Sequence, residues 1–436
     1  MRGSQIQTSI VADEALLDGL QRAAFSYFLE AVNPVNGLIA DTSRDGSPCS
    51  IGVVGFALSV YPVAVERGWM TRADAVERTL AALRFFHDSE QGEGPETTGY
   101  KGFYYHFLDM HSGARVWRSE LSMVDTALLV AGMLTAGGYF RANTPREAQL
   151  RGLVESLYLR IDWRWSQSES KTIRMGWKPE SGFLKYAWDG YSEAIVLYVL
   201  ALGSPSHPIE GGEKAYRAWT ATYQWENLYG YDFLYAGPLF IHQFSHAWID
   251  FRGIRDRFMR DKRCDYFENS RRATEVQREY ARRNPHSFAG YDENCWGLTA
   301  CDGPSQPLPE RADPRRRLFG YAARGVPYGP DDGSLAGWAA LASLPFAPEA
   351  VLCAARSMRQ RYPEMLPADQ YASSFNASLA GADRAAWVAA GHFGLDQGIV
   401  LVMIENHRSE LIWRLMRRCP HVRAGLQRAG FRGGWL

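Results

Sequence analysis

Residues 102–136, GFYYHFLDMHSGARVWRSELSMVDTALLVAGMLTA, contain the unit that decides the fold. An aromatic segment follows a glycine, a polar loop comes next, and the unit ends in a helical stretch, 124–136, that is apolar on nearly every side. A helix that is apolar all round is a buried helix. The unit therefore predicts an inner helix that the chain enters through a polar loop.

This unit occurs six times along the chain. The short segments and their inner helices are expected at 37–41 and 53–60, 102–106 and 124–136, 182–186 and 193–202, 230–233 and 242–248, 319–322 and 335–344, and 371–375 and 397–404. Further helices are predicted around them at 15–29, 71–86, 145–160, 210–222, 262–283, 347–360 and 420–430, and those that alternate with the inner helices are amphipathic with one charged face. Thr71, with Asp74 three residues on, is a candidate N-cap for one of these.

Six buried helices alternating with six outer ones predict an all-α fold, the (α/α)6 barrel, in a single domain. We expect the barrel to span residues 13–436 after an N-terminal tail at 1–12. In such a barrel the loops that enter the inner helices gather at one mouth, so functional side chains are expected there.

The composition excludes some partners and leaves others open. The 48 basic and 48 acidic residues balance, which argues against nucleic acid because phosphate binding needs an excess of Lys and Arg. The chain has 14 Trp, 22 Tyr and 21 Phe, together 13% of its residues. This aromatic content fits a sugar-binding cleft, where flat apolar faces and polar tips are both used, and equally a large aromatic core.

The termini and cysteines give weaker indications. No apolar run approaches the roughly 20 residues that span a membrane. The polar N-terminus lacks the apolar stretch of a signal peptide, so we expect a cytoplasmic protein, or a periplasmic or secreted one whose leader has been trimmed. The six cysteines form no CxxC pair, and we expect neither a metal nor another cofactor.

Three carboxylates mark the predicted mouth. Glu120 and Asp125 flank the start of the second inner helix, and Glu193 begins the third. A carboxylate in this position can simply accept N–H bonds at a helix N-terminus and gain from the helix dipole. Carboxylates on neighbouring inner helices would also face one cavity, which is how glycosidases arrange an acid and a base. Both interpretations stay open for each residue.

Two further stretches are dense in polar and aromatic side chains. In 237–252 the candidates are His242, Gln243, His246, Asp250 and Arg252; the two histidines share a helix face and suit sugar hydroxyls, core hydrogen bonds or a metal. In 291–304, Trp296 and Asp302 suit a sugar subsite, although Asp302 also suits a turn. Arg324 is a subsite donor or a surface charge. We also expect at least three of five aromatic residues to be exposed in one groove at the mouth: Trp117, Tyr186, Trp188, Trp248 and Trp296.

The segments GPLFIHQFSHAWIDFRGIRD (237–256) and YDENCWGLTACDGP (291–304) resemble signature stretches of the bacterial glycoamylase-like domain family. That family includes the β-1,2-glucanases of glycoside hydrolase family 144 and modules of cyclic β-1,2-glucan synthases. SELSMVDTALLVAGML, YSEAIVLYVLALGS, DDGSLAGWAALASLPFAPE and GLDQGIVLVMIENHRSELIW also match, so the resemblance runs from about residue 17 to 431.

The resemblance implies an (α/α)6 barrel, no cofactor, and hydrolysis of a glucose polymer, in the first place a linear or cyclic β-1,2-glucan. It also implies that Glu120, Asp125 and Glu193 line the pocket, with Glu193 as the first candidate for the catalytic acid and Asp125 for the base.

One segment departs from the family pattern. Where the family reads approximately GFxDxFN, this chain reads QYASSFN at 370–376, so Ser373 occupies the place of a pocket carboxylate. A transglycosylase and a binding-only barrel without chemistry therefore remain alternatives to the hydrolase, and Asp302 or Asp125 could supply the missing carboxylate.

Overall fold

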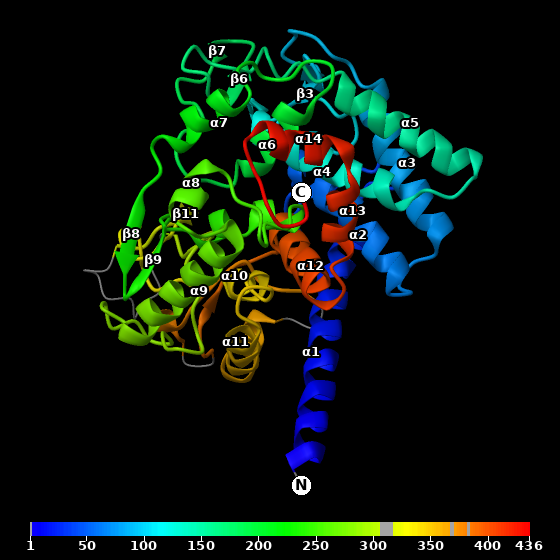
Figure 1. The fold of residues 1–436 in the computed structure, drawn as a ribbon. Coiled ribbons are helices and arrows are strands. Elements are labelled where there is room, and N and C mark those ends of the chain that lie inside the picture. The colour runs from blue at the N-terminus through cyan, green and yellow to red at the C-terminus, as the bar shows by residue number, and fades with distance from the viewer. Residues whose placement is uncertain (1, 306–316, 367–369, 382–383) are drawn as a thin grey trace.

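A ring of inner helices forms the centre of the molecule (Figure 1). The computed structural model describes residues 2–305, 317–366, 370–381 and 384–436, with side chains from residue 12 onward. The inner helices are α2 (Ile51–Glu66), α4 (Met123–Tyr139), α6 (Ile195–Gly203), α10 (Gly337–Ala342) and α12 (Gly394–Arg408). Between α6 and α10 the ring is continued by two 3-10 helices, η1 (Leu239–His242) and η2 (Phe244–Ala247). The predicted (α/α)6 barrel is thus confirmed.

The inner helices pack directly on one another: α2 against α4 and α12, α4 against α6, and α12 against η2 and α10. Hydrogen bonds from Val196 of α6 to Ser245 and from Gln243 to Ala339 of α10 join the η1–η2 pair to its neighbours and close the ring. Where α2 meets α4, a Cβ added to Gly132 would lie 1.9 Å from the carbonyl oxygen of Gly55. Only glycine permits this contact between the two backbones.

The outer helices are α1 (Arg2–Glu30), α3 (Arg72–Asp88), α5 (Pro145–Leu159), α7 (Glu213–Thr220), α9 (Tyr266–Arg283) and α11 (Pro348–Arg361). The predicted N-cap of α3 is confirmed, because the Thr71 side chain accepts a hydrogen bond from the Asp74 amide. Thr144 and Asp265 cap α5 and α9 in the same way. These caps satisfy amides that the first turn of a helix leaves without partners.

The remaining elements are short. A one-turn helix, α8 (Arg257–Asp261), precedes α9, while α13 (Leu411–Arg418) and α14 (Pro420–Arg428) pack on α4 and α6 respectively. The described strands have two to four residues and pair antiparallel: β1 (Cys49–Ser50), β2 (Gly99–Tyr100), β3 (Phe103–Tyr104), β4 (Phe107–Leu108), β5 (Leu121–Ser122), β6 (Gly176–Lys178), β7 (Gly182–Phe183), β8 (Trp225–Leu228), β9 (Tyr231–Leu234), β10 (Ala300–Cys301), β11 (Ala322–Ala323), β12 (Phe375–Asn376) and β13 (Trp387–Val388).

The sequence-based prediction differs from the structure in the fourth inner element, which was expected as an α-helix at 242–248 and is the η1–η2 pair. Its bend at Gln243, whose φ is −121°, breaks the helical path and lets the Gln243 side chain bond into the core. At the N-terminus, the backbone from Arg2 belongs to α1, which extends away from the barrel (Figure 1). The domain boundary at residue 13 stays a prediction.

Candidate active site

Six ionisable side chains meet in a cavity of about 560 Å3 at the N-terminal ends of the inner helices: Asp41, His106, Glu120, Asp125, Glu193 and Asp396. Asp125 is the third residue of α4 and Asp396 the third of α12, while Glu193 lies two residues before α6. The structure therefore brings together the three carboxylates that the sequence singled out. It adds Asp41, His106 and Asp396, which the sequence analysis did not identify.

His106 lies between two of these carboxylates. Its Nδ1 is 3.2 Å from Oε1 of Glu120, and its Nε2 is 3.6 Å from Oδ2 of Asp125. Burial lowers the pKa of His106, but Asp125 and Glu120 outweigh burial and raise it to about 9. The hydrogen bond with His106 in turn lowers the pKa of Glu120. At neutral pH an imidazolium thus stands between two anions.

Asp125 is also held by its own helix end. The Ser122 hydroxyl donates to Oδ2 of Asp125 over 2.5 Å, and the Asp125 amide donates back to that hydroxyl. This is the N-cap of α4, so the helix-end interpretation of Asp125 applies. It does not exclude a second role, because the side chain still borders the cavity.

The environment of Glu193 raises the pKa of its carboxyl, whereas that of Glu120 lowers it. Burial raises the pKa of its carboxyl to about 7, and the charge of Asp125 adds to the effect. Burial likewise raises the pKa of Asp41 to about 6. A carboxyl that keeps its proton near neutral pH, close to one that an imidazolium neutralises, is the division of roles that an acid–base pair requires.

Asp396 lies beside Ser373, the position where the family carboxylate is absent. Burial holds the pKa of Asp396 well above its usual range, although a hydrogen bond with Ser373 opposes this. Its Oδ2 is buried and has no hydrogen-bond partner among the described residues. The signal was present in the sequence, since Asp396 precedes the apolar run of α12 as Asp125 precedes that of α4.

Aromatic and aliphatic side chains form the remaining walls of the cavity. They include Phe107, Trp188, Phe240, Phe244, Tyr321, Trp338 and Phe393. Of the aromatic residues proposed from the sequence, Trp188 lines this cavity, and Tyr321 is an addition. Flat apolar walls around acidic groups suit the faces and hydroxyls of a sugar ring.

Asp302 lies at the rim and does not line the cavity, although its neighbours Ala300 and Cys301 do. Its carboxylate pairs with Arg44, whose guanidinium lies 5.3 Å from the centre of the Phe393 ring. The pair ties two loops of the mouth together.

The candidates of segment 237–252 lie in the core, away from the cavity. His242 bonds to the carbonyl of Ala236 and His246 to the hydroxyl of Ser270, while the Gln243 amide donates to Ala339 and Ser343. Burial lowers the pKa of His242 to about 4 and that of His246 to about 3. None of these three side chains lines the cavity, so their position gives the sugar-binding prediction no support.

Five other candidates are also structural. Asp250 is buried and pairs with Arg252 and Arg417, which are partly exposed and also pair with Glu410. Trp296, like Trp248, is fully buried. Arg324 is completely buried and pairs with Asp332, so it is neither a surface charge nor a cavity donor.

Two proposed aromatic residues lie on the surface. Trp117 is 68% exposed and lines a second hollow of about 1000 Å3 beside the mouth. Tyr186 is 66% exposed and lines neither this hollow nor the cavity. Because Trp248 and Trp296 are buried, and Trp117 and Trp188 line different hollows, the prediction that three of the five aromatic residues share one groove is not confirmed.

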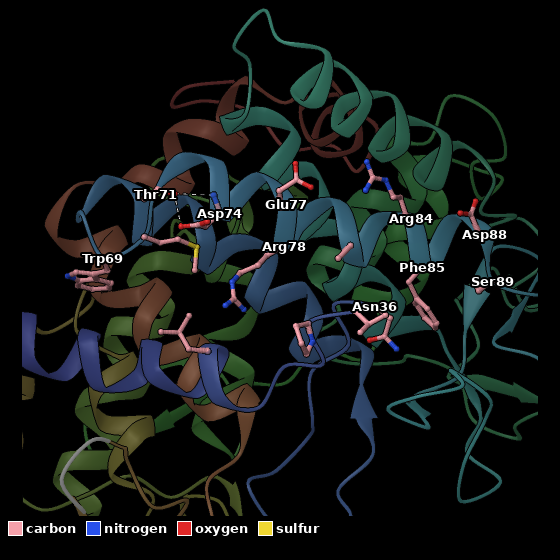
Figure 2. A pocket seen from close by; sticks show the side chains of 15 residues that line it. Asn36, Trp69, Thr71, Asp74, Glu77, Arg78, Arg84, Phe85, Asp88 and Ser89 are labelled. Carbon is pink, nitrogen blue, oxygen red and sulfur yellow. Dashed lines mark hydrogen bonds between the residues drawn. The ribbon is translucent and has the colours of Figure 1, made fainter.

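A third hollow, of about 960 Å3, runs along the outside of α3, with Trp69 at one end and Phe85 at the other (Figure 2). Its polar groups serve the surrounding helices: Asp74 accepts from Thr71, Glu77 pairs with Arg146, and Arg84 donates to Gln149. We therefore place the candidate active site in the inner cavity.

The described residues hold no group of three or more His, Cys, Asp or Glu side chains that could bind a metal ion. No described helix is long and apolar enough to cross a membrane.

Comparison with known proteins identifies relatives over nearly the whole chain. The chain is 27% identical to the exo β-1,2-glucooligosaccharide sophorohydrolase of Parabacteroides distasonis over 96% of its own length, and it spans 58% of that protein. A solved structure described as a "putative glucoamylase" from Bacteroides uniformis has 30% identity and a TM-score of 0.85, and the match covers 97% of this chain and 98% of that one. The endo-β-1,2-glucanase of Chitinophaga pinensis, solved with sophorotriose and glucose, has 25% identity and a TM-score of 0.81, covering 97% and 99%.

The family comparison agrees with these relatives. Residues 185–420, more than half of the chain, match the family model Glycoamylase, described as "Putative glucoamylase". Together with the barrel and its acidic cavity, the match shows that the chain belongs to the glycoamylase family.

Proposed function

We propose that this protein is a glycoside hydrolase that cleaves β-1,2-linked glucan by carboxylate acid–base catalysis. The observation that carries the proposal is the pairing of Glu193, whose pKa is raised to about 7, with Asp125 in one aromatic-walled cavity. The linkage is taken from the relatives named as β-1,2-glucan hydrolases.

In this mechanism Glu193 keeps its proton in the buried site and donates it to the leaving glycosidic oxygen. Asp125 accepts a proton from a water molecule, which attacks the anomeric carbon as the bond to the leaving sugar breaks. The proton that Glu193 loses and the one that Asp125 gains balance, so the enzyme recovers its starting state by proton exchange with solvent. This single displacement inverts the anomeric configuration.

His106 assists without touching the bond that breaks. As an imidazolium it neutralises part of the charge of Asp125 and Glu120, which permits several carboxyl groups to share a small cavity. Glu120, anchored to His106, is proposed to bind sugar hydroxyls or to orient the imidazole. In either role it is secondary to the Glu193–Asp125 pair.

The test is incubation with linear and cyclic β-1,2-glucans, and with β-1,3- and β-1,4-glucans, followed by chromatography of the products. We expect cleavage of the β-1,2 substrates alone, with the α-anomer formed first. Product sizes separate exo action, which releases one short oligosaccharide, from endo action, which releases a ladder. Transfer of the glucosyl unit to an added acceptor sugar instead of water would overturn the proposal that the protein is a hydrolase. Binding of glucan without any product would do the same.

A further inference from the structure

Trp117 is a large aromatic side chain that the fold holds out in solvent. It is 68% exposed, and its backbone has a φ of 56°, followed by 49° at Arg118. Left-handed backbone at two successive non-glycine residues is strained, and such strain persists only where the surrounding structure enforces it. Exposure and strain in the same residue indicate a role outside the core.

The loop around Trp117 is anchored at both ends. The Arg115 side chain, 2% exposed, donates to the carbonyl of Ser119 over 2.5 Å and pairs with Glu180 at 2.6 Å. The Val116 amide donates to the carbonyl of Phe107 over 3.1 Å. Because these bonds fix the residues on either side, the indole is presented in a defined place.

That place adjoins the candidate active site. The ring centre of Trp117 lies 5.0 Å from that of Phe107, and Phe107 both lines the catalytic cavity and stacks on His106. On its other side Trp117 borders the hollow of about 1000 Å3, where Arg44, Asp45 and His111 supply polar groups. Arg44 also approaches Phe393, a second wall of the cavity. The hollow therefore lies next to the cavity, with Phe107 and Phe393 between the two.

We propose that Trp117 stacks on glucosyl units of the same glucan chain that lie outside the cavity, and so makes the enzyme prefer long substrates. A pyranose ring has an apolar face for the indole and a rim of hydroxyls for the charged groups around it. The occupant follows from this adjacency, because a polymeric chain bound with its scissile bond between Glu193 and Asp125 continues out of the cavity. This inference rests on the proposed function.

The experiment compares the Trp117→Ala and Trp117→Phe variants with wild type on β-1,2-linked oligosaccharides of increasing length. We expect Trp117→Ala to lower kcat/KM for long chains by about tenfold through KM, which corresponds to one aromatic contact, and to leave the shortest cleaved substrates unaffected. Trp117→Phe should retain most of the long-chain preference. Tyr328→Ala is the matched control, because Tyr328 is also 68% exposed but lines none of these hollows.

Binding separates this inference from the proposed function. Calorimetry on the Glu193→Gln background, with the same length series, should show that Trp117→Ala reduces the ratio of long-chain to short-chain affinity. An unchanged ratio, or an equal loss at every length, would overturn the inference even if wild type cleaves the polymer. Absence of hydrolysis by wild type would instead overturn the proposed function. The ratio of long-chain to short-chain affinity would still decide the role of Trp117.

Discussion

The mouth carboxylates and the segment 237–252 are both dense in polar side chains, but the structure places them in opposite environments. Asp125, Glu193 and Asp396 sit at the N-terminal ends of inner helices and border the cavity. His242 and His246 turn toward the outer helix α9, where Asn269 and Ser270 bond to them. The direction of the side chain decides the difference, because Phe240 and Phe244 of the same segment line the cavity.

The same comparison shows how burial acts on charge. Burial drives His242 and His246 to the neutral form, and core groups bond to both ring nitrogens of His242 and to Nε2 of His246. Burial also favours the neutral form of Glu193, but there the cavity leaves the proton available to a ligand. Burial against packed helices indicates a structural residue, and burial beside open space indicates a reactive one.

The largest expected effect is on turnover. Asp125→Asn should lower kcat by about 100-fold or more, because general acid–base catalysis contributes about 100- to 10,000-fold. His246→Gln is the counterpart in the core, and it should reduce stability while leaving the turnover of the folded fraction near that of wild type. Steady-state kinetics measures kcat, and urea unfolding measures stability. Similar losses of kcat in the two variants would remove the distinction between the cavity carboxylates and the core histidines.

The next effect concerns Arg324, a substrate-binding candidate that the structure assigns to the core. Its guanidinium pairs with Asp332 and donates to the carbonyls of Cys301 and Phe319, all within 3 Å. Arg324→Met should therefore destabilise the fold by about 3–5 kcal/mol, since it leaves a buried charge unpaired. Asp332→Asn should also lower the free energy of unfolding. A stable Arg324→Met variant with impaired glucan binding would instead restore Arg324 to the site.

The pH dependence of stability tests the environment of Glu193. The unfolded chain releases this proton near pH 4.5, whereas the native site keeps it until about pH 7. Between these values the native state binds more protons, so Glu193 lowers stability as pH rises, by about 3 kcal/mol in full. Glu193→Gln removes this penalty, so its stability relative to wild type should improve from pH 4.5 to pH 8 in urea unfolding. If the difference in unfolding free energy between Glu193→Gln and wild type does not depend on pH, the Glu193 carboxyl titrates normally.

The smallest expected effect is at Asp396. Because burial raises the pKa of this carboxyl well above its usual range, the neutral amide of Asp396→Asn resembles the form that burial favours, and kcat should change only a few-fold. Ser373→Ala, which removes its hydrogen-bond partner, is the companion variant. If Asp396→Asn lowers kcat as much as Asp125→Asn does, Asp396 is the functional replacement for the family carboxylate that is missing at Ser373.

Sequence patterns predicted the fold further than they predicted the site. Apolar periodicity identified the inner helices α4 and α12, and the Thr71 cap located the start of α3, because these signals are local. The failures at Gln243 and Arg324 have a common cause, since their partners Ser343 and Cys301 lie 100 and 23 residues away in the sequence. Asp396 was missed although its pattern matched that of Asp125. His106 was missed because its role depends on two carboxylates that the fold brings to it.

The central claim is that Glu193 is the acid of a β-1,2-glucan hydrolase, and the pH profile of kcat tests it most directly. Wild type should lose activity on linear β-1,2-glucan as pH rises through about 7, where the Glu193 carboxyl gives up its proton. Glu193→Gln should be at least about 100-fold slower and lack this limb, while Glu210→Gln, at an exposed carboxylate, should match wild type. A Glu193→Gln variant with unchanged turnover and the same alkaline limb would contradict the account.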